Sequence, residues 1–166
     1  MNFDILNDKE YIEIVSDILN SDNFKKLKYI KHHNSNRYSH LIRVSYASYR
    51  LALKEDLDYK SVARGALLHD YFFTDNTKLD REGRLHVLFN HPLHALYNAK
   101  KEFKLNKIEE DIIISHMYPV NISWKPKYKE SKLVDKVDNI ISILEFSNYT
   151  KRKLKSFLFS FIYNRV

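Results

Sequence analysis

The chain contains no cysteine, which excludes disulfide bonds, thiolate metal sites and cysteine nucleophilic catalysis. It has only two glycines, Gly65 and Gly83. Glycine-rich phosphate loops and dinucleotide-binding fingerprints are therefore not expected, and most β-rich folds with tight turns are disfavoured. No apolar run approaches the length of a membrane span, and the N-terminus is acidic and lacks a signal-peptide pattern. We expect a cytoplasmic protein with no membrane partner.

The composition is that of an ordinary folded protein. The 166 residues are 44% hydrophobic and 30% charged, which suits one domain over 1–166 with a sizeable core. The formal net charge is +7. A basic balance favours an anionic partner, and a small nucleotide and a nucleic acid would both fit.

Apolar residues recur at helical spacing through nearly the whole chain. We expect helices at about 8–20, 38–55, 59–72, 107–117, 130–147 and 150–164, and one that begins at Pro92 within its first turn. Asp58 and Ser61 are candidate caps, and Asn106 with Glu109 resembles a capping box. The prediction is an all-α fold, a compact single-domain bundle of about six to eight helices.

Two segments lack this helical pattern. Residues 22–37 are polar and basic, and their end, "HHNSNR", is expected to form a loop. Residues 74–90 contain Gly83 in the middle and are expected to be irregular. Because this second segment carries Lys78, Arg81 and Arg84, it could lie over a pocket as a lid.

Several of the eight histidines lie where a metal site could form. His40, His69 and His116 lie in or beside the apolar faces of separate expected helices, and His91 directly precedes Pro92. Apolar faces point inward, so these imidazoles could converge inside the bundle. Imidazole and carboxylate are ligands of divalent metals, and helix bundles build such sites from facing helices.

Asp70 strengthens this hypothesis, because it follows His69 inside an apolar run. Burying an isolated carboxylate is costly unless a cation or hydrogen-bond donors compensate for the lost water. A bound metal would supply that compensation.

The histidine and aspartate segments together resemble a known family. "RYSHLIRVS", "ARGALLHD", "NHPLHALYNA", "IIISHMYP" and "ESKLVDKVDNIISILE" follow one another in the chain. Their order is similar to the H…HD…D signature of the HD superfamily of metal-dependent phosphohydrolases, and the middle segments are similar to those of its binuclear branch. The resemblance covers about 37–146, with helical additions at both ends.

The resemblance implies a divalent metal site, with two metals expected. The implied ligands are His40, His69, Asp70 and Asp138 for the first metal and Asp70, His91 and His116 for the second. Asp70 would bridge the two, and Fe, Mn, Zn, Ni, Co and Mg are not distinguished. Asp135 is the alternative to Asp138, which we prefer because its spacing to Glu145 resembles the closing pattern of the family.

The implied activity is hydrolysis of a phosphoester or phosphoanhydride of a small metabolite, with a nucleotide favoured, by metal-activated water. Asp70 and His69 would be the catalytic residues. Arg43 and Arg37 are the preferred substrate-binding candidates, since Arg43 lies one helical turn after His40.

Secondary candidates surround this core. His94 or His86 could protonate the leaving group, and Trp124 and Tyr128 could stack on a nucleobase.

Two other functions remain open. The same ligand set occurs in mixed-valent di-iron oxygenases related to this family. A non-catalytic, basic helical module that binds a nucleotide or nucleic acid is less favoured, because the Lys and Arg clusters are spread along the chain. The sequence does not indicate an oligomeric state.

Overall fold

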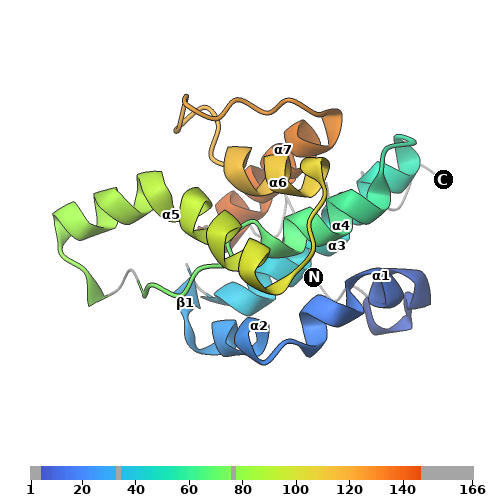
Figure 1. The fold of residues 1–166 in the computed structure, drawn as a ribbon, viewed down its shortest axis with the longest axis horizontal. Helices are drawn as coiled ribbons and strands as arrows, with labels where there is room; N and C mark the ends of the chain where they lie inside the picture. The colour runs from blue at the N-terminus through green and yellow to red at the C-terminus, as the bar shows by residue number, and fades with distance from the viewer. Residues whose placement is uncertain (1–4, 33–34, 76–77, 147–166) are drawn as a thin grey trace.

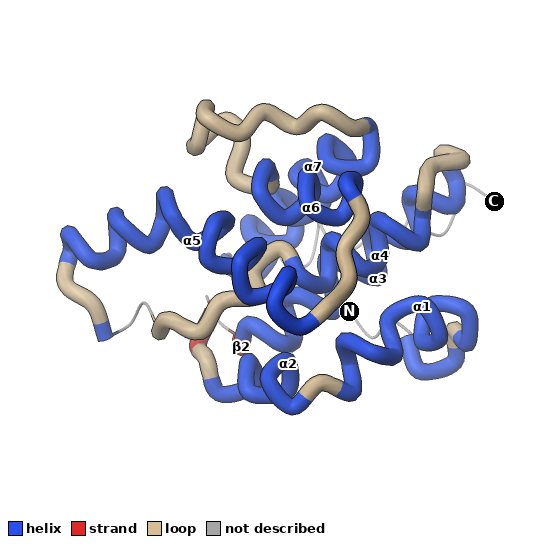
Figure 2. The backbone as a smooth tube through the Cα atoms, in the orientation of Figure 1, coloured by secondary structure: helices blue, strands red, loops and turns tan. Residues whose placement is uncertain are grey.

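A computed structural model describes residues 5–32, 35–75 and 78–146 (Figure 1). The α-helices are α1 (Lys9–Asn20), α2 (Asp22–Lys26), α3 (Arg37–Lys54), α4 (Tyr59–Leu68), α5 (Arg81–Glu102), α6 (Lys107–Ser115) and α7 (Lys129–Phe146). Short 3-10 helices η1 (Ile5–Asn7) and η2 (Leu27–Tyr29) and a hairpin of β1 (Lys31–His32) and β2 (Ser35–Asn36) complete the described part. Figure 2 shows helices joined by loops, which confirms the all-α prediction.

Side-chain caps fix where several helices begin. The Asp58 carboxylate accepts a hydrogen bond from the Ser61 backbone N–H at the start of α4. Asn106 and Glu109 form the expected capping box of α6. These caps satisfy backbone N–H groups that have no partner within their own helix.

Helices α3 and α4 occupy the centre of the bundle. α3 packs against α4 and α7, and α4 also packs against α1 and α6. The contact of α4 with α6 depends on Gly65, since an added Cβ would lie 2.9 Å from Ile112 Cδ1 and 3.2 Å from Glu109 Cα. The two helices can therefore approach closely only because residue 65 has no side chain.

The expectation that 74–90 is irregular was wrong for 81–90, while residues 74–75 and 78–80 lie outside the α-helices as expected. Helix α5 begins at Arg81, where the Asp80 side chain accepts a hydrogen bond from the Gly83 backbone N–H. Pro92 consequently lies in the helix interior, and not in its first turn. Leu85, Leu88 and Phe89 do recur at helical spacing, but the polar residues around Gly83 led to the expectation of an irregular segment. In the structure these three side chains are exposed, so this part of the apolar stripe of α5 is not buried within the described residues.

Other boundaries also differ from expectation. The helix expected at 59–72 ends at Leu68, because the chain turns at the His–Asp pair that follows. The segment 22–37 contains α2 and the β1–β2 hairpin in addition to loop. The helix expected at 150–164 lies outside the described residues. Of the helices described, none is both long enough and apolar enough to cross a membrane.

Candidate metal centre

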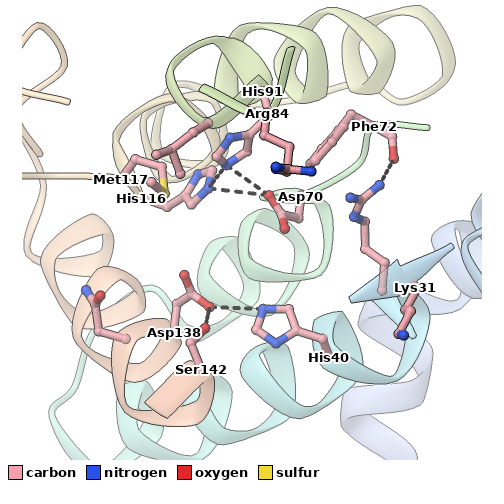
Figure 3. Close-up of a pocket in the computed structure, with 13 residues that line it drawn as sticks. Lys31, His40, Asp70, Phe72, Arg84, His91, His116, Met117, Asp138 and Ser142 are labelled. Carbon is pink, nitrogen blue, oxygen red and sulfur yellow. Dashed lines mark hydrogen bonds and ion pairs between the residues drawn. The ribbon is translucent and has the colours of Figure 1, made fainter. Parts of the chain in front are cut away.

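The expected metal ligands come from five helices and meet in the interior, and Figure 3 shows all of them except His69. They are His40 in α3, His69 and Asp70 directly after α4, His91 in α5, His116 directly after α6, and Asp138 in α7. All of these side chains are buried. The fold thus gathers residues that are almost one hundred positions apart in the chain into one cluster.

The first group of donors is built around α3, α4 and α7. His40 Nε2 lies 3.0 Å from Asp138 Oδ1, and His69 Nε2 lies 3.6 Å from the same oxygen. Donor atoms of His40, His69 and Asp70 all lie within 4.8 Å of one another. This spacing allows several donors to reach one ion.

The second group lies on the other side of Asp70. Asp70 Oδ1 is 3.2 Å from His91 Nε2 and 3.5 Å from His116 Nε2, and the two imidazole nitrogens are 2.9 Å apart. Donor atoms of Asp70, His91 and His116 also lie within 4.8 Å of one another. Asp70 therefore belongs to both groups.

The second nitrogen of each imidazole is held by an acceptor. The contacts are His69 Nδ1 to Ala66 O at 2.8 Å, His91 Nδ1 to Val87 O at 3.0 Å, His116 Nδ1 to Ile113 O at 2.8 Å, and His40 Nδ1 to Glu145 Oε2 at 3.2 Å. A carbonyl or carboxylate oxygen only accepts here, so each Nδ1 carries the proton. In its neutral form, each ring then presents its Nε2 lone pair to the cluster.

This arrangement calls for a positive ion. The lone pairs of His91 Nε2 and His116 Nε2 and the Asp70 carboxylate converge, although acceptors repel one another unless a proton or metal lies among them. Imidazole nitrogens and carboxylate oxygens are common ligands of divalent transition metals. The donor set therefore fits a divalent metal.

Electrostatics keep His69, Asp70 and Asp138 in the ionisation states that metal binding needs. Burial lowers the pKa of His69 to about 4, so this imidazole is neutral at neutral pH. Burial alone would raise the pKa of Asp70, but the neighbouring His91 and His116 hold it well below its usual range. The pKa of Asp138 is likewise lowered, because His69 and His40 outweigh the effect of burial. Both carboxylates are ionised.

The HD domain family profile matches residues 37–142, a span that contains both donor groups. The chain belongs to the HD domain family. Comparisons with curated proteins and with solved structures gave no match. HD domains are generally metal-dependent hydrolases, which agrees with the donor set found in this chain.

Glu145 is a residue of this HD domain site that the sequence interpretation used only for spacing. Its Oε2 faces His40 Nδ1, while its Oε1 lies 2.7 Å from Arg43 Nη2 and 2.9 Å from Arg43 Nε. Glu145 follows Asp138 by seven positions in α7, which is about two helical turns, so both carboxylates lie on one side of that helix. This spacing was the sequence feature that could have placed Glu145 at the site.

Arg43 was expected at the substrate, but the structure places it against Glu145. Its guanidinium fixes the carboxylate that orients His40, and Arg43 is not among the described residues that line the pocket. This placement gives no support to a contact between Arg43 and a substrate phosphate.

The donor groups open into a cavity of about 530 Å³, a size typical of small-molecule sites. Arg37 lines it but is itself buried. Its Nη1 donates to Phe72 O at 2.6 Å and to Thr74 O at 3.3 Å, and its guanidinium lies 3.6 Å from the centre of the Phe72 ring. Burial lowers the pKa of Arg37, an effect that Asp70 opposes.

Several other expected residues lie away from the donors. His86 and His94 are exposed, and neither they nor Trp124 and Tyr128 are among the described residues lining this cavity. Asp135 belongs to neither donor group, and burial, followed by the charge of neighbouring Asp138, raises its pKa to about 6.

Proposed function

We propose that this HD domain is a metal-dependent phosphohydrolase that hydrolyses a phosphoester or phosphoanhydride of a small metabolite, with nucleotides as the first class to test. The observation that carries the proposal is the shared position of Asp70. Its carboxylate belongs to two donor groups that meet at the base of one cavity. Such an arrangement suits two metals acting on one phosphoryl group.

The residues would divide their roles by group. The first metal would be held by His40, His69, Asp70 and Asp138, and the second by Asp70, His91 and His116. When bound, these metals would supply Lewis-acid stabilisation of phosphoryl oxygens and lower the pKa of water.

Asp70 and His69 would be central to catalysis for a structural reason. They follow the rigid helix α4, and the bond from His69 Nδ1 to the Ala66 carbonyl oxygen fixes the orientation of the imidazole. Ionised Asp70 is positioned to accept a hydrogen bond from an attacking water and to hold it near the phosphoryl group. The burial of both side chains limits competing solvent.

A panel of nucleotides and simple phosphoesters, assayed with Mn, Fe, Co, Ni, Zn or Mg, tests this function. The wild-type protein should release phosphate from at least one member, and His69→Ala and Asp70→Ala should lose this activity by at least about 10³-fold. His94→Ala provides a matched control, because His94 is an exposed histidine one turn from His91 on α5. Equal activity of Asp70→Ala and His94→Ala would contradict the proposal.

A further inference from the structure

We propose that Lys31 and Arg84 bind the non-bridging oxygens of the terminal phosphate of the substrate, so that the site prefers phosphomonoesters and terminal anhydrides to phosphodiesters. The inference rests on the proposed function and specifies its substrate class. Lys31 was not a candidate in the sequence interpretation, and Arg84 was named there only as one of the basic residues of a possible lid.

The two side chains come from separate elements to the same cavity. Lys31 lies in β1 and Arg84 in the first turn of α5, and both line the cavity that contains the metal-donor groups. Figure 3 shows Arg84 near His91 and Asp70, Lys31 at the lower right, and Asp138 and Ser142 of α7 at the lower left. Basic side chains from two separate elements therefore border the cavity into which the donor groups open.

The Arg84 guanidinium is held in place by one hydrogen bond within the described residues, and its other N–H donors remain available. Its Nη1 donates to the backbone oxygen of Leu79 at 2.6 Å, which anchors the side chain beside the start of its own helix. A guanidinium has five N–H donors in a rigid fork, so this single bond leaves capacity for a phosphate. The exposed side chain also needs little desolvation to meet an anion.

Arg37 cannot take this role as readily. Its guanidinium is buried, donates to the carbonyl oxygens of Phe72 and Thr74, and covers the Phe72 ring. It therefore acts as a positioning residue that fixes the segment after the His–Asp pair and adds a fixed positive charge behind the cavity. Direct contact with the outer phosphate oxygens falls to exposed Lys31 and Arg84.

The charge of the substrate phosphate distinguishes phosphomonoesters from phosphodiesters. A phosphomonoester carries about −1.5 to −2 charges at neutral pH, whereas a diester carries one and has an organic group on each side. The three basic residues that line the cavity, Lys31, Arg37 and Arg84, favour the more highly charged terminal phosphate. The remaining wall includes Leu88, Met117 and Asn139, which are uncharged and suit a single organic group.

The test compares Lys31→Ala and Arg84→Ala with Lys28→Ala and Arg81→Ala, exposed basic residues nearby in the chain that do not line the cavity. Calorimetry with inorganic phosphate on the metal-loaded proteins measures binding without catalysis. Kinetics with p-nitrophenyl phosphate and with bis(p-nitrophenyl) phosphate measure the class preference. Metal content is determined for every variant.

We expect Lys31→Ala and Arg84→Ala each to weaken phosphate binding and to raise KM for the monoester about tenfold, with unchanged metal content. The diester KM should change less than about threefold, and the controls should match the wild type. Failure of the metal-loaded wild type to bind phosphate would overturn the inference, as would equal effects in test and control variants.

The result also separates the two proposals. If no phosphoester is hydrolysed but Lys31→Ala and Arg84→Ala weaken phosphate binding, the phosphate site is supported and the hydrolase function is contradicted. If hydrolysis occurs but these variants leave KM for the monoester and phosphate affinity unchanged, the hydrolase function is supported and the phosphate site at Lys31 and Arg84 is contradicted.

Discussion

His91 and His116 face each other through Nε2 atoms only 2.9 Å apart, while the Nδ1 atom of each ring is held by a backbone carbonyl oxygen. Two neutral imidazoles in these tautomers would direct lone pairs at each other. A cation between them and Asp70 removes this repulsion and gives the residues a common role. Without the cation, a proton must occupy the same space.

This relationship leads to a prediction about metal number. In the double variant His91→Ala/His116→Ala, only the donors His40, His69, Asp70 and Asp138 remain. We expect the wild type to bind two metals per chain and this variant to bind at most one, with unchanged helical circular dichroism. Unchanged two-metal content in the variant would show that these histidines hold no ion.

Glu145 should tune the affinity of the first metal through His40. Glu145→Ala removes the carboxylate that holds His40 Nδ1 and should weaken metal binding about 10- to 100-fold. Glu145→Gln keeps an amide oxygen able to accept from Nδ1–H, so it should lose less. Metal titration of both variants beside Glu13→Gln, an exposed glutamate on α1, measures this difference. Equal losses in Ala and Gln variants would argue against an orienting hydrogen bond.

Metal binding should also depend on pH through His40. Burial lowers the pKa of this imidazole, but hydrogen bonds to Asp138 and Glu145 outweigh burial and raise it to about 9 in the metal-free protein. Below that pH, a metal must displace the His40 proton, so affinity should rise with pH by up to about tenfold per unit between pH 6 and 8. His69 adds no proton, because its pKa is lowered to about 4.

The measurement for this pH effect is calorimetry of metal binding at pH 7 in buffers of different ionisation enthalpy. Release of close to one proton from the protein per first metal is expected. Affinity that stays constant from pH 6 to 8, with no proton release, would show that His40 binds no metal or is already deprotonated.

The close packing of α4 against α6 gives a stability prediction. Gly65→Ala places a Cβ 2.9 Å from Ile112 Cδ1 and 3.2 Å from Glu109 Cα, so the helices must separate. The free energy of unfolding should fall by about 1–3 kcal/mol, measured by urea denaturation. In Gly83→Ala the nearest atom is the side-chain oxygen of exposed Asp80, so the loss should be smaller. Equal or greater loss in Gly83→Ala would contradict this packing argument.

The sequence predicted the features that local patterns determine. The capping box at Asn106 and Glu109 and the buried His69–Asp70 pair both followed from residues near one another in the chain. The start of α5 was missed because Gly83 and the polar residues before Leu85 favoured an irregular segment, although Leu85, Leu88 and Phe89 recur at helical spacing.

Other relationships depend on tertiary structure. His40 and Glu145 are 105 residues apart, so their contact has no local signature. Arg43 shares a face of α3 with His40, as expected, but the position of Glu145 on α7 determines what its guanidinium meets. Lys31 and Arg84 reach one cavity only because the hairpin and α5 both border it.

The most direct test of the central claim is metal analysis of the protein purified without chelator, beside the variant His69→Ala/Asp70→Ala. We predict close to two metals per chain in the wild type and loss of both in the variant, because Asp70 belongs to both donor groups. Full metal content in the variant, or no metal in the wild type even after reconstitution with Mn, Fe, Co, Ni and Zn, would contradict the account.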